Sequence, residues 1–179
     1  MMITVSPCFH WIGYHISTGL LQEGYEVVGI DHMDDLLCDH LYMFVGRNSN
    51  FQHFYNHIDK EKHLHTGPEE WRVNIEDSLL IIQQGADKSL TKRIEMPELY
   101  GEWMDLTALN IHSSDGLYQW VLKNNGVYIS DFVNEVCDFL VIGKDHDLRI
   151  DQAKSEGEIR RNVEAVWKSH ELSLSLGLM

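Results

Sequence analysis

Residues 2–31, MITVSPCFHWIGYHISTGLLQEGYEVVGID, decide the fold. The stretch begins with the apolar run Met2–Val5 and ends with a second apolar run that leads to Asp31. Between the two runs, apolar residues of 12–21 recur at helical spacing, and Gly24 favours a helix end because glycine adopts positive φ without a Cβ clash. A strand, a crossover helix and a parallel second strand open a dinucleotide-binding fold. The sequence therefore predicts an α/β protein, a reduced Rossmann-like parallel sheet with helices on both faces.

The same spacing rules assign the rest of the chain. We expect one Rossmann-like domain over 1–179, with a nucleotide-binding-like half over about 1–92. A carboxyl-terminal half over about 93–170 could form a small lobe. Asp34 or Asp35 is expected to cap a helix end, since carboxylates accept hydrogen bonds from the first free amides. The remaining expected elements are a strand at Leu41–Val45, a helix over Phe51–Ile58, an amphipathic helix over Trp71–Ile82, a helix over 115–124, a strand end and helix over 127–136, a strand and turn over 138–150, a helix over 151–170 and a loose tail.

Two segments of the opening stretch, WIGYHI and LLQEGYEVVGID, resemble the NAD-dependent epimerase/dehydratase family, the extended short-chain dehydrogenase/reductases. That family opens with VTGxxGxxGxHL, a helix and GYEVxGxD. By this resemblance Gly13 stands for the third glycine and Asp31 for the acid that holds the adenosine ribose. The cofactor-binding residues that the resemblance implies are Ser6, His10, Trp11, Ile12, Gly13 and Asp31.

The resemblance continues in the second half of the chain. The segment RIEMPELYGEW is similar to the family's RxPxxYGPW loop, which implies that Tyr100 and Trp103 contact substrate. VYISDFVNEV at 127–136 is similar to the family's YVDDVVEAI. The resemblance covers about residues 2–45 and 92–152, and the interval between them is too short for the strands and helices that carry the family's catalysis.

The family's phosphate loop is altered here. Pro7 and His10 stand where the first two glycines belong. Proline removes an N–H that could face phosphate, and a histidine side chain would lie where the phosphates sit. The resemblance implies that the protein binds NAD(P). The substitutions at positions 7 and 10 argue against that cofactor, so the identity of any cofactor stays open.

The family's catalytic pair, Tyr-x-x-x-Lys, is also missing. None of the seven tyrosines is followed by lysine four residues later, the spacing that places both side chains on one helical face. We therefore expect a degenerate sugar-nucleotide epimerase/dehydratase-like protein without catalytic activity, acting as a binding or regulatory protein. Two alternatives stay open: an active NAD(P)-dependent epimerase/dehydratase with an altered glycine loop, and a protein-interaction module with an empty cofactor cleft.

The composition of the chain argues against some classes of binding partner and indicates a cellular compartment. The chain carries 28 acidic and 14 basic residues, which argues against nucleic acid and anionic membranes. No apolar run approaches the roughly 20 residues that cross a bilayer, and no secretory signal pattern opens the chain. Three cysteines, odd in number and far apart, suit a reducing cytoplasm. A nucleotide sugar or a protein are the partners considered, and a homodimer through Val73–Ile82 stays open.

Two further clusters have competing interpretations. His53 and His57, four residues apart on an expected helix, could give two nitrogen ligands to zinc or nickel. A solvated helix end without a third ligand is the interpretation we favour, so no metal site is predicted. Cys8 could form a nucleophile pair with His10 or His15, but a packed thiol is favoured because no third group orients the pair.

Overall fold

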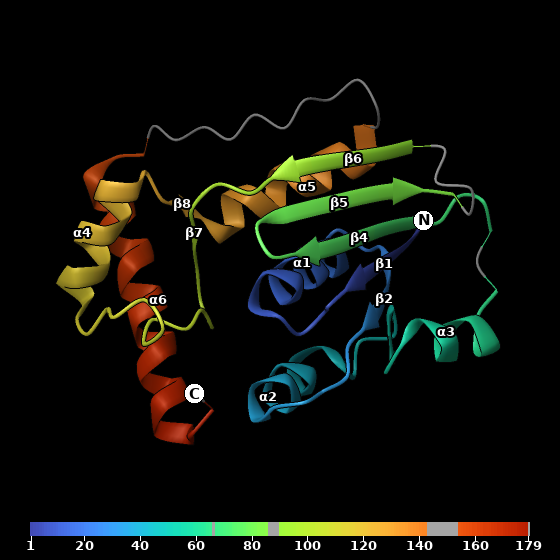
Figure 1. Cartoon of the computed structure of the whole chain (residues 1–179), viewed down its shortest axis with the longest axis horizontal. Helices are drawn as coiled ribbons and strands as arrows, with labels where there is room; N and C mark the ends of the chain where they lie inside the picture. The colour runs from blue at the N-terminus through green and yellow to red at the C-terminus, as the bar shows by residue number, and fades with distance from the viewer. Residues whose placement is uncertain (66, 86–89, 143–153, 179) are drawn as a thin grey trace. The chain divides into compact units, whose positions relative to one another are not determined.

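The computed structural model describes residues 1–65, 67–85, 90–142 and 154–178 (Figure 1). The chain divides into two compact units, Met1–Met96 and Pro97–Met179, each with its own elements. Within the described residues, no helix is both long and apolar enough to cross a membrane.

The opening stretch of the first unit folds as a strand, a helix and a strand. β1 (Met2–Ser6) pairs in parallel with β2 (Glu26–Ile30), and α1 (Trp11–Gln22) connects them. The helix buries residues at helical spacing, and Gly24 follows it at φ 82°. The prediction for this stretch is confirmed.

The sheet of the first unit has six strands in the order β3-β2-β1-β4-β5-β6. β3 (Phe51–Phe54), β2, β1 and β4 (Trp71–Glu76) are parallel, whereas β5 (Leu79–Gln84) and β6 (Leu90–Glu95) run antiparallel to their neighbours. The α/β class is confirmed, but the expectation of a parallel sheet is wrong because the second half of the sheet is a meander.

The amphipathic helix expected over Trp71–Ile82 is instead the β4–β5 hairpin. Trp71, Val73 and Ile75 are buried at alternate positions, which is the period of a strand. Asp77 takes φ 49° in the tight turn, a conformation that aspartate tolerates better than most residues.

Two more elements differ from the expectation. The strand expected at Leu41–Val45 is the end of α2 (Leu36–Val45), which Asp35 caps by accepting a hydrogen bond from the Cys38 N–H at 2.8 Å. The helix expected over Phe51–Ile58 is β3 followed by α3 (His57–His63). The prediction that Asp34 or Asp35 caps a helix is confirmed for Asp35.

The two faces of the first sheet differ in chemistry. A Cβ placed on Gly13 of α1 would lie 3.1 Å from Ile75 Cδ1, so the apolar face of β1 and β4 lies against α1. Thr4 points to the other face, where its hydroxyl donates to Glu70, the carboxylate that also pairs with Lys60 of α3. That second face combines the polar Thr4 with buried apolar residues such as Val28, and Lys60 connects it to α3.

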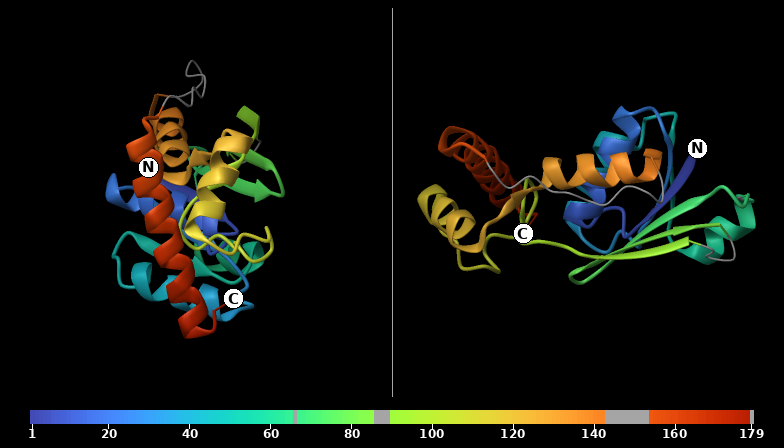
Figure 2. Two further views of the ribbon diagram at one scale, coloured as in Figure 1. Left: turned by 90° about the vertical axis from the view of Figure 1, so that its left-hand side faces the viewer. Right: turned by 90° about the horizontal axis from the view of Figure 1, so that it is seen from above.

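The second unit is built mainly of helices. α4 (Ser114–Asn124) and α6 (Glu156–Leu176) pack together, and α6 begins with a capping box between Ser155 and Glu158. α6 is the long uninterrupted red helix in both views of Figure 2. The other elements are the parallel pair β7 (Leu99–Tyr100) and β8 (Val127–Tyr128), and α5 (Ile129–Ile142).

Most of the assignments for the second unit hold. The helices expected over 115–124, 127–136 and 151–170 correspond to α4, α5 and α6. The strand expected from 138 is wrong as far as 142, because α5 continues to Ile142, and residues 143–153 lie outside the described part. The tail expected from 171 is helical as far as Leu176.

Replacing Gly13 by alanine tests the close approach of α1 to the loop after β1. The new Cβ would lie 2.0 Å from the Pro7 carbonyl oxygen, so the loop or the helix must move. We expect Gly13→Ala to lower the free energy of unfolding in urea by about 1–3 kcal/mol, the usual cost of overpacking. Gly67→Ala is the matched control, since nothing lies within 4 Å of its Cβ position. Equal effects of the two substitutions would contradict this packing.

Candidate functional site

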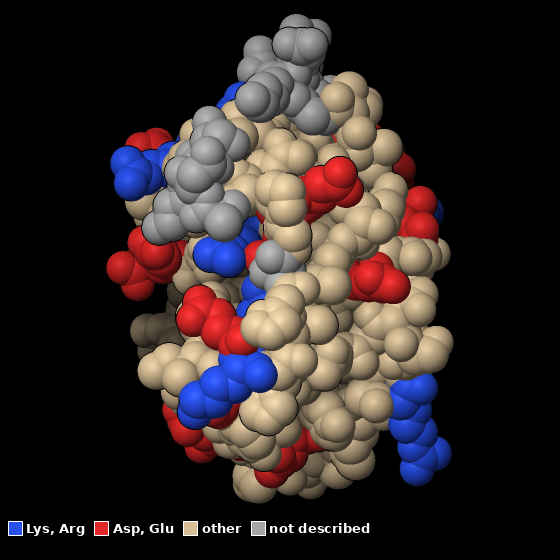
Figure 3. Space-filling model, turned by 90° about the vertical axis from the view of Figure 1, so that its right-hand side faces the viewer, with Lys and Arg blue, Asp and Glu red and all other residues tan. Residues whose placement is uncertain are grey.

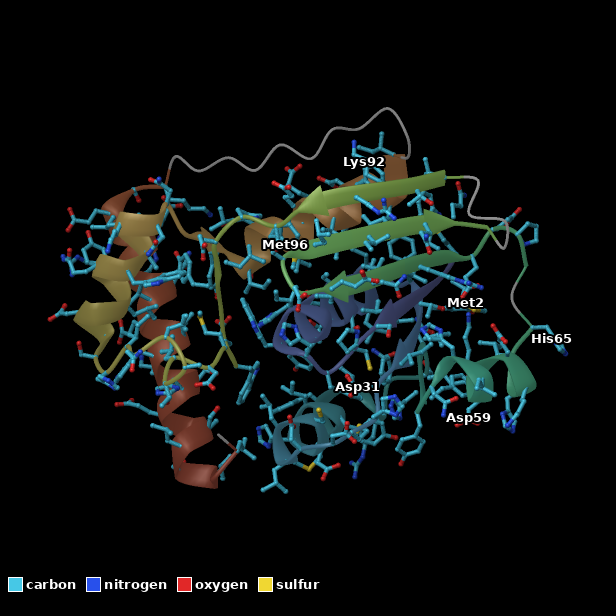
Figure 4. The ribbon with its side chains drawn as sticks, in the orientation of Figure 1. Met2, Asp31, Asp59, His65, Lys92 and Met96 are labelled. Atoms are coloured by element: carbon cyan, nitrogen blue, oxygen red, sulfur yellow. The ribbon has the colours of Figure 1, made fainter. Side chains whose placement is uncertain are left out.

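A pocket of about 280 Å³ lies at the carboxyl ends of β1, β2 and β3. Asp31, which follows β2, and Asp59, in the first turn of α3, are labelled in Figure 4 and mark the elements beside it. Parallel strands present their carboxyl ends at one edge of a sheet, which is where ligands bind in open α/β folds. The pocket is lined by Ser6, Pro7, Ile30, Asp31, His32, Asp34, Asn56 and His57.

The loop after β1 bends over the end of β2. The Cys8 N–H donates to the Ile30 carbonyl oxygen at 3.0 Å, and the Phe9 N–H donates to Asp31 Oδ2 at 2.8 Å. The approach is close enough that a Cβ on Gly29 would lie 2.6 Å from Cys8 Sγ. Two amides of this loop are therefore bonded within the protein.

The Asp31 carboxylate accepts hydrogen bonds both from the loop after β1 and from the residues that follow β2. Its Oδ1 accepts from the Met33 N–H at 3.1 Å and from the Cys38 thiol at 3.9 Å. Its carbonyl oxygen lies 2.9 Å from His53 Nε2. A carboxylate has about four lone-pair positions, so Asp31 keeps acceptor capacity for a ligand at the pocket wall.

Phe9 anchors the loop through its ring. Only 2% of Phe9 is exposed, and its ring centroid lies 6.0 Å from Tyr42, 6.1 Å from Phe51 and 5.4 Å from His53. Edge-to-face contacts at these distances are favourable beyond the burial of apolar area. An aromatic cluster thus occupies the surroundings of Asp31, beside the pocket.

A buried ionic cluster joins the sheet to α3, the helix whose first residue, His57, lines the pocket. The Glu70 side chain is 3% exposed and accepts hydrogen bonds from Lys60 Nζ, from the Thr4 hydroxyl at 2.5 Å and from Arg72 Nη2 at 3.0 Å. A buried carboxylate needs such donors because its desolvation is costly. Lys60 is in α3, and the cluster therefore fixes this helix against β1 and β4.

The cluster also influences the ionisation of His57. Burial lowers the pKa of His57 most, and the nearby Lys60 and Arg72 cations lower it further against Glu61 and Glu70. A lowered pKa favours the neutral imidazole, which offers one donor and one acceptor nitrogen. His57 is therefore suited to hydrogen bonding with an uncharged polar ligand.

The structure brings two of the six expected cofactor-binding residues into the pocket lining, Ser6 and Asp31. His10 is the N-cap of α1 and makes no side-chain capping bond. The other three form the first turn of α1, where Ile12 and Gly13 are buried and Trp11 is half-buried.

The two expected substrate-binding residues lie in the second unit. Tyr100 is 1% exposed and packs on the Tyr128 ring at 5.4 Å between centroids, and burial raises its pKa. Trp103 is half-buried, has φ 68°, and donates its N–H to Ser169 Oγ at 3.1 Å.

The histidine pair does not have the expected geometry. His53 is in β3 and bonds to the Asp31 carbonyl, whereas His57 opens α3, so the two are not on one helical face. Across the residues that the structure describes, no three His, Cys, Asp or Glu side chains are grouped as metal ligands.

The thiols near the site are packed. Cys8 and Cys38 are both buried, and burial raises the pKa of Cys38 to about 12, with Asp35 and Asp31 adding to the effect. Burial and Asp31 raise the pKa of Cys8 as well. Because the thiolate is the nucleophile, burial and a raised pKa both disfavour reaction at these cysteines. The interpretation of Cys8 as a packed thiol is confirmed.

The sequence pattern did not identify His32 and Asn56 as pocket residues, and His57 was considered only in a metal site that was not predicted. The missing signal was β3: a strand at Phe51–Phe54 would have put residues 55–57 at the carboxyl edge of the sheet. His32 directly follows Asp31 and could have been found by the same rule.

Comparison with known proteins found no matching family model, no matching curated protein and no matching solved structure. The site is therefore interpreted from its own chemistry. Among the described residues on the face drawn in Figure 3, basic and acidic side chains are interspersed and much of the surface is uncharged.

Replacing Lys60 tests the buried cluster. Lys60→Met leaves the Glu70 carboxylate without one of its charged donors, and we expect a loss of about 3 kcal/mol in the free energy of unfolding in urea. Lys62→Met is the control, because Lys62 forms only an exposed pair with Asp59 at 3.7 Å and should change stability by less than about 1 kcal/mol. A Lys60 effect as small as that of Lys62 would refute a structural role for the cluster.

Proposed function

We propose that this chain is a non-catalytic binding protein, a degenerate relative of the sugar-nucleotide epimerases and dehydratases, whose pocket takes the sugar part of a nucleotide sugar. The observation that carries the proposal is the use of the β1–α1 loop. Its Cys8 and Phe9 amides bond to Ile30 and Asp31, next to an open pocket whose lining includes several polar side chains.

The loop argues against a dinucleotide. Dinucleotide folds bind pyrophosphate through free amides of this loop and at the N-terminus of the next helix. Here Pro7 has no N–H, and the next two amides of the loop, those of Cys8 and Phe9, are bonded within the protein.

The pocket favours a sugar. Its volume of about 280 Å³ is at the small end of ligand sites, which suits a single ring. The lining offers acceptors on Asp31 and Asp34 and mixed donors and acceptors on Asn56 and His57. Hydroxyl groups both donate and accept hydrogen bonds, so a polyhydroxylated ring matches this set better than an anionic group does.

The proposal is tested by thermal shift with UDP-glucose, UDP-glucuronate, NAD, NADP and NADH. We expect a nucleotide sugar to raise the melting temperature, since a ligand at 100 times its Kd adds about 2.7 kcal/mol to stability. The His57→Gln/Asp34→Asn variant should lose at least about tenfold in affinity, the loss of one or two hydrogen bonds. Glu23→Gln, an exposed change at the C-cap of α1, should bind as the wild type does.

Three results would contradict the proposal. Stabilisation by a nicotinamide cofactor would favour the active enzyme with an altered loop. Binding that ignores the His57 and Asp34 substitutions would place the ligand elsewhere. If none of the five compounds raises the melting temperature, the sugar ligand is contradicted and the protein-interaction alternative is favoured.

A further inference from the structure

α2 presents an apolar surface to solvent as well as to the core. Its inward residues, Cys38, Leu41 and Val45, are buried. On the outside, Leu36 is 61% exposed, Met43 67% and Phe44 58%. We call Leu36, Met43 and Phe44, with the half-buried His40, the α2 outer face.

These residues form one continuous stripe. At about 100° per residue, positions 36, 40, 43 and 44 fall within an arc of about 100°, opposite the three buried positions. The Phe44 ring lies 5.1 Å from His40 and 6.5 Å from Tyr14 of α1, which extends the stripe onto the neighbouring helix.

The stripe is unusual for a helix with one side in water. A surface helix normally carries charged and polar residues opposite its core face, whereas a helix that is apolar all round is covered on both sides. Single exposed apolar residues need no explanation, but a contiguous group marks an interaction site. The α2 outer face therefore fits a surface that another element covers.

The charges around the α2 outer face indicate what kind of element would cover it. Asp34, Asp35 and Asp39 are exposed at the amino-terminal end of the stripe, and α2 itself contains no lysine or arginine. We propose that the α2 outer face binds a basic amphipathic helix of a partner protein. Leucine-like residues one turn apart would lie on Met43 and Phe44, and flanking lysines would face the three carboxylates.

A second copy of the chain fits less well. Self-pairing through this face would bring two sets of Asp34, Asp35 and Asp39 together, each on a chain of net charge −14. The proposal goes beyond the sugar pocket and does not depend on it.

Binding of a labelled synthetic peptide to the full chain tests the proposal. The probe is a leucine/lysine amphipathic helix of about five turns, measured by fluorescence anisotropy at low and at high salt. We expect saturable binding that weakens with salt. A scrambled peptide of the same composition and a leucine/glutamate peptide should bind at least about tenfold more weakly, since charge and periodicity both contribute.

Matched variants locate the binding site. Met43→Ser/Phe44→Ser should weaken binding at least about tenfold, as expected where central apolar anchors are removed. Leu109→Ser/Leu122→Ser is the control, because both leucines are exposed and lie in the second unit. Asp34→Asn/Asp39→Asn should reduce the salt dependence, while Asp35 is left intact because it caps α2.

The outcomes are distinct. Equal loss in the two serine variants, or binding unaffected by Met43 and Phe44, would overturn the assignment. Self-association in sedimentation equilibrium that the Met43→Ser/Phe44→Ser variant abolishes would assign the face to a second copy and would also overturn it. Sugar binding measured on the Met43→Ser/Phe44→Ser variant, which leaves the pocket lining unchanged, separates this result from the proposed function.

Discussion

The hydrogen bond from the Phe9 N–H to Asp31 Oδ2, at 2.8 Å, determines how the first unit uses its binding edge. It fixes the loop after β1 over the end of β2 and directs the Phe9 ring into the cluster of Tyr42, Phe51 and His53. A hydrogen bond to a charged group contributes about 1.5–3 kcal/mol, enough to hold a short loop in one conformation. The Phe9 amide is thereby bonded within the protein, while Asp31 also lines the pocket.

The buried ionic cluster around Glu70 imposes a second constraint on the same site. Glu70 is buried, and Thr4, Lys60 and Arg72 supply donors that stabilise its carboxylate. Those contacts fix α3, and α3 carries His57 into the pocket lining. The cations of the cluster also favour neutral His57, so the buried charges influence both the position and the hydrogen-bonding character of the pocket wall.

Periodicity predicted the fold where one pattern dominates. Residues 2–31 combine two short apolar runs with one helical stripe, and the structure matches them. In α2 the exposed Met43 and Phe44 disguised a helical pattern as an apolar strand. In residues 71–82, apolar residues alternate along two strands that meet at a turn at Asp77. The positions of these apolar residues are also compatible with helical spacing, which is why a helix was predicted.

The site was predictable only in part, because some of its residues depend on elements that the sequence pattern did not identify. Asp31 and Ser6 follow from the opening strands, whereas Asn56 and His57 depend on recognising β3. The bond between Phe9 and Asp31 joins residues 22 positions apart and has no local pattern to reveal it.

The strand order relates the architecture to the proposed role. Four strands keep the parallel order β3-β2-β1-β4, with the change of direction next to β1 that creates a binding edge in α/β folds. The last two strands are added as antiparallel neighbours. Antiparallel strands need only a tight turn, whereas each parallel strand needs a crossover of a dozen or more residues. A sheet completed by antiparallel strands keeps the carboxyl edge of its parallel strands but needs no further crossover helices. In the epimerase/dehydratase family proposed as a relative, a helix of this kind carries the catalytic pair. This architecture supports the proposal of a protein that binds its ligand without hydride transfer.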